Sequence, residues 1–195
     1  MGETISLENE YERAFARAKE VLESGGVIVY PTDTVYGIGG DGRRGEVAER
    51  IRKIKQREDC PFSVLLGNIH MVREYADAQG EDMKYVLEAF PGATTLIMKA
   101  KKDIPVVREG KIGVRVPEHL FMRKLSIELD MPIITTSANL HGKEAPRSFG
   151  EVEKEILDSV DLALDGGSTL CGMPSTIIDV TEKKVKRVGA GEVIF

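Results

Sequence analysis

The sequence predicts a single domain of mixed α/β class, built on one twisted sheet of parallel and antiparallel strands flanked by helices. Helical and strand patterns intermingle along the 195 residues, and 42% hydrophobic with 30% charged residues is typical of a globular protein. Consecutive strand patterns at 94–99 and 112–116 have no helix between them, and the same holds for the last strands. Parallel neighbours would need a crossover helix each time, so a purely parallel sheet is excluded.

The N-terminal elements follow from apolar spacing. A helix is expected over 8–24, because apolar residues recur there at helical spacing and Gly25-Gly26 follows as a stop. The β-branched run at 27–30 predicts a buried strand that ends at Pro31, and the segment PTDTVYGIGGDG after it reads as a loop. Residues 45–56 place their apolar side chains on one helical face, which predicts a second helix.

The rest of the chain repeats these two patterns without a linker, an internal repeat or a low-complexity segment. We expect one domain over 1–195. Strands are expected at 62–66, 94–99, 112–116, 132–136, 160–164, 175–180 and 185–188, and helices at 68–78, 81–90, 118–129 and 149–157.

Charge is unevenly distributed. The net charge of -5 argues against a surface built to coat nucleic acid. Residues 43–57 and 99–115 are nevertheless rich in Lys and Arg, whereas 144–165 is acidic. This segregation favours a locally positive site for a polyphosphate or another anion, although solvated helix faces explain the same charges equally well.

Several protein classes are disfavoured. No apolar run approaches the roughly 18 to 20 residues of a membrane span, and the first residues lack the pattern of a signal peptide, so we expect a cytoplasmic protein without a membrane partner. Cys60 and Cys171 belong to no CxxC pair, which predicts plain thiols, neither a zinc site nor a disulfide. The three histidines are not spaced as a metal set, and we expect no protein-bound metal.

A literal GxGxxG pattern stands at Gly37, Gly39 and Gly42. A dinucleotide-binding turn follows its strand tightly, but here six loop residues intervene. We therefore do not expect NAD or FAD, and the chain has no P-loop motif. The glycines still allow a ligand to approach the backbone closely.

Polar residues mark several candidate ligand contacts. Thr34 lies in the PTDTVYG loop, where its hydroxyl would either hold a ligand or cap the loop. Lys55 and Arg57 end a helix, where cations favour the negative helix end or else clamp a phosphate. Arg115 lies within the apolar strand IGVRV and needs an anionic partner, from the protein or from a ligand, and we favour a ligand.

Two further segments place small polar groups at strand ends. Ser137 and Asn139 directly follow the buried strand PIITT, at a position typical of ligand sites in α/β proteins. Ser175 stands where the strand in PSTIID begins. A simple turn is the alternative explanation for the serine and asparagine.

Taken together, these ordered motifs resemble the YrdC-like family of threonylcarbamoyl-AMP synthases over residues 8 to 195. The motifs are the PTDTVYG loop, KxR at Lys55 and Arg57, RVPEH from Arg115, SxN at Ser137 and Asn139, PSTIID, and the closing RVGAG. The resemblance implies a twisted α/β fold with a basic concave face. It also implies a nucleotidyltransferase reaction in which L-threonine, bicarbonate or CO2, and ATP give threonylcarbamoyl-AMP and pyrophosphate, the first step in threonylcarbamoylation of the tRNA adenosine next to the anticodon.

The resemblance also implies roles for individual residues. Lys55 and Arg57 would be catalytic, Mg²⁺ would accompany ATP, and a downstream transferase would use the adenylate. The implied threonine site is Thr34, Arg115, Ser137 and Ser175, and the implied ATP site is Arg57, Lys111, Asn139, Arg147 and Arg187.

The chain departs from the family pattern in two places. The segment after Arg57 is about one residue short, and Leu65 or Leu66 stands where members often have a His. The sequence ends at Phe195, so we expect the short form, without the additional C-terminal domain. Two alternatives stay open: a non-catalytic module that binds tRNA or double-stranded RNA with the same basic face, and a carbamoyl-handling relative of the same fold.

Overall fold

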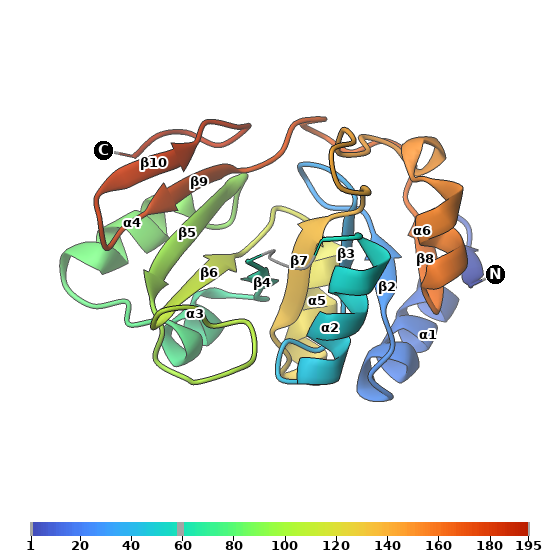
Figure 1. Ribbon diagram of the computed structural model, residues 1–195, viewed down its shortest axis with the longest axis horizontal. Helices are drawn as coiled ribbons and strands as arrows, with labels where there is room; N and C mark the ends of the chain where they lie inside the picture. The colour runs from blue at the N-terminus through green and yellow to red at the C-terminus, as the bar shows by residue number, and fades with distance from the viewer. Residues whose placement is uncertain (1, 58–60, 195) are drawn as a thin grey trace.

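The computed structural model describes residues 2–57 and 61–194 (Figure 1). Cys60 and the start of the shortened segment after Arg57 lie outside these residues. The helices are α1 Tyr11–Glu23, α2 Gly45–Ile54, α3 Ile69–Tyr75, α4 Glu81–Ala89, α5 Leu120–Leu129, the 3-10 helix η1 Phe149–Glu151 and α6 Lys154–Ser159. The strands are β1 Glu3–Ser6, β2 Ile28–Tyr30, β3 Gly37–Gly39, β4 Ser63–Leu65, β5 Thr94–Lys99, β6 Lys111–Arg115, β7 Ile133–Ser137, β8 Leu162–Asp165, β9 Thr176–Asp179 and β10 Lys184–Arg187.

The strands form one mixed sheet in the order β1-β8-β2-β3-β7-β4-β6-β5-β9-β10. The pair β5–β6, which has no helix between its strands, is antiparallel, and so is β9–β10. Parallel pairs join strands that are distant in sequence, such as β1 with β8 and β4 with β6. The predicted mixed α/β sheet is therefore confirmed.

The sheet buries both of its faces. Successive side chains of a strand point to opposite faces, so neighbours such as Val64 and Leu65 enter different hydrophobic clusters. One cluster contains the apolar faces of α1 and α5, including Phe15 and Phe121, whose rings pack edge to face. The other contains residues from α2, α3, α4 and α6. Two-sided burial explains why these strands read as continuous apolar runs.

Three sequence predictions need correction. Strand β1 was not expected. Strand β3 was assigned to a loop because GIG has low strand propensity. Its glycines are required by close packing, since a Cβ on Gly39 would lie 1.8 Å from the carbonyl oxygen of Ile134. The helix expected over 149–157 is two short pieces, η1 and α6.

Neither membrane nor metal features emerge from the described ranges. No helix within residues 2–57 and 61–194 is long and apolar enough to cross a bilayer. No group of three His, Cys, Asp or Glu side chains in these ranges could hold a metal ion. Cys171 is an exposed free thiol.

Candidate functional site

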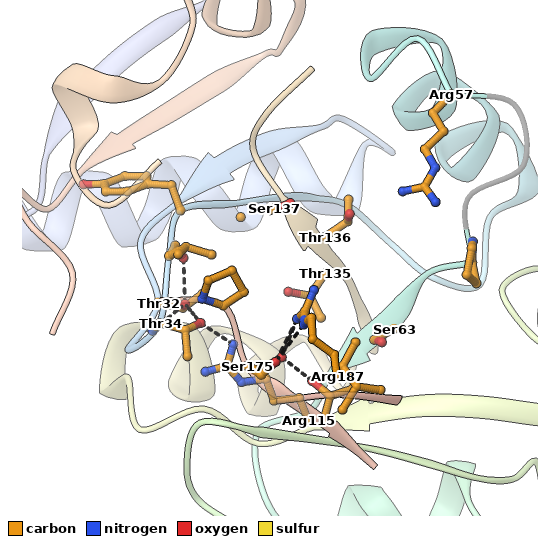
Figure 2. A pocket seen from close by; sticks show the side chains of 17 residues that line it. Thr32, Thr34, Arg57, Ser63, Arg115, Thr135, Thr136, Ser137, Ser175 and Arg187 are labelled. Carbon is orange, nitrogen blue, oxygen red and sulfur yellow. Dashed lines mark hydrogen bonds between the residues drawn. The ribbon is translucent and has the colours of Figure 1, made fainter. Parts of the chain in front are cut away.

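A polar cavity of about 310 Å³ lies where the ends of several strands meet (Figure 2). Its wall includes the loop after β2, the residues from Thr135 to Ser137 of β7, Ser63 of β4 and the end of β6. Strand register brings these segments together, because Ser137 pairs with Gly37 and Thr135 pairs with Ser63. The volume is at the lower end of the range of small-molecule sites, about 300–1,000 Å³.

Three guanidinium groups face this cavity. Arg57 approaches it from the end of α2, and Arg115 and Arg187 stand on the other side (Figure 2). No carboxylate is among the described residues that line it. Arg187 is an exposed residue, but desolvation of the enclosed part of its guanidinium lowers its pKa, and the positive charge of Arg115 lowers it further. Like charges gathered without an acid in the wall favour an anionic ligand.

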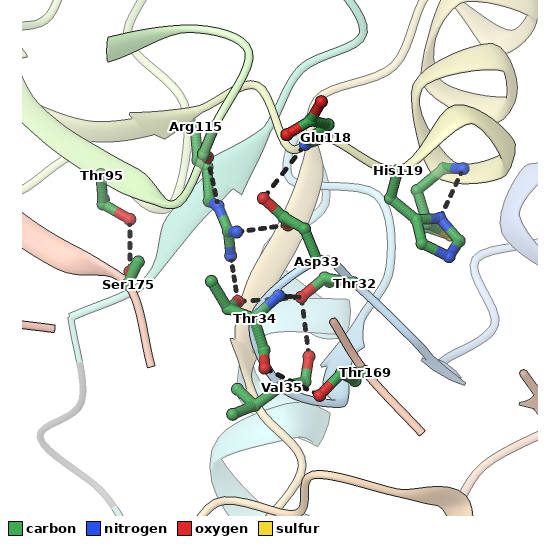
Figure 3. A network of polar contacts seen from close by, with 12 residues as sticks. Thr32, Asp33, Thr34, Val35, Thr95, Arg115, Glu118, His119, Thr169 and Ser175 are labelled. Atoms are coloured by element: carbon green, nitrogen blue, oxygen red, sulfur yellow. Dashed lines mark hydrogen bonds and ion pairs between the residues drawn. The ribbon is translucent and has the colours of Figure 1, made fainter. Parts of the chain in front are cut away.

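Arg115 is buried and held from two sides (Figure 3). Its Nη2 donates to Oδ1 of Asp33, and its Nη1 donates to Oγ1 of Thr34 at 2.6 Å. Burial lowers the pKa of Arg115, and the Asp33 carboxylate opposes this shift. The sequence left the anionic partner of Arg115 open between the protein and a ligand, with a ligand favoured. The structure shows that the protein supplies one such partner, Asp33, so a ligand carboxylate would be a second one, and that contact stays a prediction.

Hydroxyl groups make up much of the remaining wall. Ser137 donates to Oδ1 of Asn139, and Ser175 lies 2.9 Å from the hydroxyl of Thr95. Arg187 donates to the Ser175 carbonyl at 2.8 Å and to its hydroxyl at 3.3 Å. The structure therefore brings all four residues of the predicted threonine site, Thr34, Arg115, Ser137 and Ser175, to one cavity together with Arg57 and Arg187.

Lys55 is placed differently from the expectation. It is buried at the end of α2, and its ammonium donates to the carbonyls of Ser137 and of Asn139, the latter at 2.9 Å. It does not line the cavity. A lysine that satisfies two loop carbonyls fixes the SxN segment, and its catalytic role stays a prediction.

Three predicted ATP contacts are also absent from the cavity wall. Lys111 makes ion pairs with Asp179 and Glu182. Asn139 uses its amide nitrogen to brace the following turn, and Arg147 is exposed near Glu144. In the structure these side chains interact with neighbouring acids or carbonyls, so their contacts with ATP stay predictions.

Sequence reasoning missed several hydroxyls in the wall. Thr95, Thr135 and Thr136 lie on strands that were read only as apolar. The pairs TT in β5 and TTS in β7 were the available signal. The Ser and Thr residues of the wall that were omitted from the candidate set are Thr32, Ser63, Thr95, Thr135 and Thr136.

The basic stretch at 43–57 is largely neutralised by ion pairs. Arg43 pairs with Asp41, Arg50 with Asp161 and Arg52 with Glu49. Arg57, at the end of this stretch, lines the cavity. The RNA-binding alternative draws on the basic concave face as a whole, and it stays untested.

Comparison with known proteins shows the family of this chain. A model of the Sua5/YciO/YrdC family, described as telomere recombination, matches residues 20–191. The chain belongs to this family. A putative threonylcarbamoyl-AMP synthase of Methanocaldococcus jannaschii is 33% identical over 186 residues, which cover 94% of this chain and 88% of that protein. Uncharacterized protein YciO of Escherichia coli is also 33% identical, over 97% and 95% of the two chains.

Solved structures of family members share the fold. E. coli YciO superimposes with a TM-score of 0.88 at 31% identity and covers 100% of this chain and 98% of its own. Sua5 of Pyrococcus abyssi, solved in complex with L-threonine, gives a TM-score of 0.85 at 26% identity. That match covers 97% of this chain but 57% of Sua5, so the chain spans little more than half of that relative.

Leu65 and Leu66, one of which stands where family members often have a His, are fully buried. Leu65 and Leu66 enter the two opposite hydrophobic clusters. Neither lines the cavity, whose wall in this region is formed by Pro61 and Ser63. In this family member, therefore, the position serves packing.

Proposed function

We propose that this chain is a threonylcarbamoyl-AMP synthase. It would convert L-threonine, bicarbonate or CO2, and ATP into threonylcarbamoyl-AMP and pyrophosphate. The observation that carries the proposal is a single cavity that joins the hydroxyls and the buried Arg115 of the predicted threonine site to the guanidinium groups of Arg57 and Arg187. Relatives that carry the same name, and the threonine complex of P. abyssi Sua5, support the choice of substrates.

Different residues would bind the two substrates, threonine and ATP. Arg115 pairs with the carboxylate of threonine, since its terminal nitrogens offer a planar fork. Arg57 and Arg187 neutralise the phosphates of ATP. The neutral threonine amine bonds to the carbon of CO2 and releases a proton, or bonds to the carbon of bicarbonate and releases water, and either route gives a carbamate. A carbamate oxygen then attacks the α-phosphorus in line while pyrophosphate leaves. Such a displacement needs positioning and charge neutralisation more than a protein nucleophile.

Lys55 would contribute through position. By holding the carbonyls of Ser137 and Asn139, it fixes the strand end that carries the Ser137 hydroxyl into the cavity. The described lining offers no carboxylate for Mg²⁺, so the proposed metal would enter with ATP on its phosphates, and no step is assigned to it. The adenylate would pass to a transferase that modifies tRNA.

The test is pyrophosphate release from ATP with Mg²⁺ and bicarbonate, with and without L-threonine. Threonine-dependent release is expected from the wild-type chain. Arg57→Ala should raise the KM for ATP and Arg115→Lys the KM for threonine, because each removes a fork from one end of the cavity. Arg17→Ala, which removes a half-exposed arginine paired with Glu3 and Glu20, is the matched control and should leave both constants unchanged. Release that is absent or independent of threonine would refute the proposal.

A further inference from the structure

The turn from Thr32 to Val35 fixes the direction of its own hydrogen bonds (Figure 3). The Thr32 hydroxyl donates to the carbonyl of Val35 at 2.7 Å and accepts from the backbone N–H of Thr34 at 3.1 Å. It also lies 2.9 Å from the Thr34 hydroxyl. A hydroxyl has one proton and two lone pairs. Because the Thr32 proton is already committed, Thr34 must be the donor in this hydroxyl pair.

The direction of that bond limits what Thr34 offers to a ligand. Its hydroxyl gives its proton to Thr32 and accepts from Nη1 of Arg115 at 2.6 Å. One lone pair is left. At the cavity wall the Thr34 oxygen therefore acts only as an acceptor, and its partner must carry an N–H or an O–H.

Arg115, in contrast to Thr34, can only donate hydrogen bonds to a ligand. Of its five N–H groups, one points to the Gly92 carbonyl at 3.4 Å, one to Thr34 and one to Asp33. Each terminal nitrogen keeps one N–H that the described residues do not use. Asp33 is held in turn, since its second oxygen accepts from the backbone N–H of Glu118 at 3.1 Å. The guanidinium plane is thereby fixed, with two donors left for a ligand.

We propose that Thr32 and Asp33 are positioning residues that set the polarity of the amino-acid subsite. Asp33 orients Arg115 to donate to a carboxylate, and Thr32 forces Thr34 to accept from the adjacent amino group. This inference rests on the proposed function and deepens it. An acceptor-only Thr34 also cannot donate to the amine. Once the ammonium has lost a proton to solvent, its lone pair therefore stays available to bond to the carbon of bicarbonate or CO2.

Thr32→Val separates this role from simple packing. Valine matches threonine in shape but removes the hydroxyl, so Thr34 becomes free to turn its proton toward the ligand. Thr32→Ser keeps the hydroxyl and is the conservative rescue. Ser126→Ala removes another buried hydroxyl, which donates to the Met131 carbonyl outside the cavity, and it controls for lost stability.

The measurement is calorimetric binding of L-threonine and of (R)-3-hydroxybutanoate, which lacks the amino group, to each variant confirmed as folded by circular dichroism. We expect wild type to prefer threonine and Thr32→Val to lose about tenfold of that preference, the effect of about one hydrogen bond. Thr32→Ser should restore most of the loss, and Ser126→Ala should keep the wild-type preference.

An unchanged preference in Thr32→Val, a loss in Thr32→Ser as large as in Thr32→Val, or no threonine binding by wild type would overturn the inference. Pyrophosphate release is scored separately on wild type. If wild type binds threonine but releases no pyrophosphate, the proposed function fails while the binding arms still decide the role of Thr32.

Discussion

The buried pair of Asp33 and Arg115 can be tested with variants whose effects on the free energy of unfolding and on activity are expected to differ. Both residues are almost inaccessible, at 4% and 5% exposed. Arg115→Met would leave the Asp33 carboxylate buried with the Glu118 N–H as its remaining described partner, and Asp33→Asn would leave a buried guanidinium without its counter-charge. Breaking a buried pair from either side costs about 3–5 kcal/mol of unfolding free energy.

The double variant removes both charges and should therefore cost much less than the sum of the single variants. We expect a total loss near that of one single variant, which corresponds to a coupling free energy of at least about 2 kcal/mol. Urea unfolding followed by far-UV circular dichroism at pH 7 measures all four proteins. All three variants should lack threonine-dependent pyrophosphate release, because Arg115 is absent or misoriented.

The matched control is the half-exposed pair of Glu3 and Arg17, whose side chains are 32% and 42% exposed. Its cycle with Glu3→Gln and Arg17→Met should give a coupling of about 1 kcal/mol or less. Additive losses at Asp33 and Arg115, or a double variant that regains threonine-dependent release, would refute the reasoning that this pair is a structural charge balance that presents Arg115 to a ligand.

Three further outcomes are expected. Lys55→Met keeps the aliphatic stem but leaves two partly buried carbonyls without the ammonium donor of Lys55, so urea unfolding should show a loss of about 2–4 kcal/mol. A loss below about 1 kcal/mol would contradict the bracing role. Gly39→Ala should destabilise the fold by about 3 kcal/mol or more, because its Cβ meets the Ile134 backbone, whereas Gly150→Ala, with open space around it, should be near neutral in the same assay. Burial raises the pKa of Asp161, but its hydrogen bonds outweigh this and lower it overall. Its stabilising effect is therefore present above the unfolded pKa of about 4 and lost as pH falls below it, so Asp161→Asn should flatten the acid limb of a thermal-melting series, and an unchanged limb would contradict this.

The mixed sheet was predictable because its causes are local. Apolar runs and helical spacing mark the strands and helices, and the short connection between β5 and β6 leaves room only for an antiparallel pair. Strand β3 was not predicted because the feature that favours its glycines is not local in sequence. Gly39 is needed because the backbone of the neighbouring strand lies too close for a Cβ, and the sequence of one segment does not indicate which segment will pack against it.

The sequence alone determined which residue types gather near the ligand, since Thr34, Arg115, Ser137 and Ser175 stand at the ends of elements that local patterns predict. Only the tertiary structure decided where their charges and protons are directed. Asp33 meets Arg115 across 82 positions. Lys55 donates to carbonyls that are 82 and 84 positions away in the chain, and Lys111 forms ion pairs with Asp179 and Glu182. Electrostatic pairing depends on distance in space, and the folded sheet sets that distance.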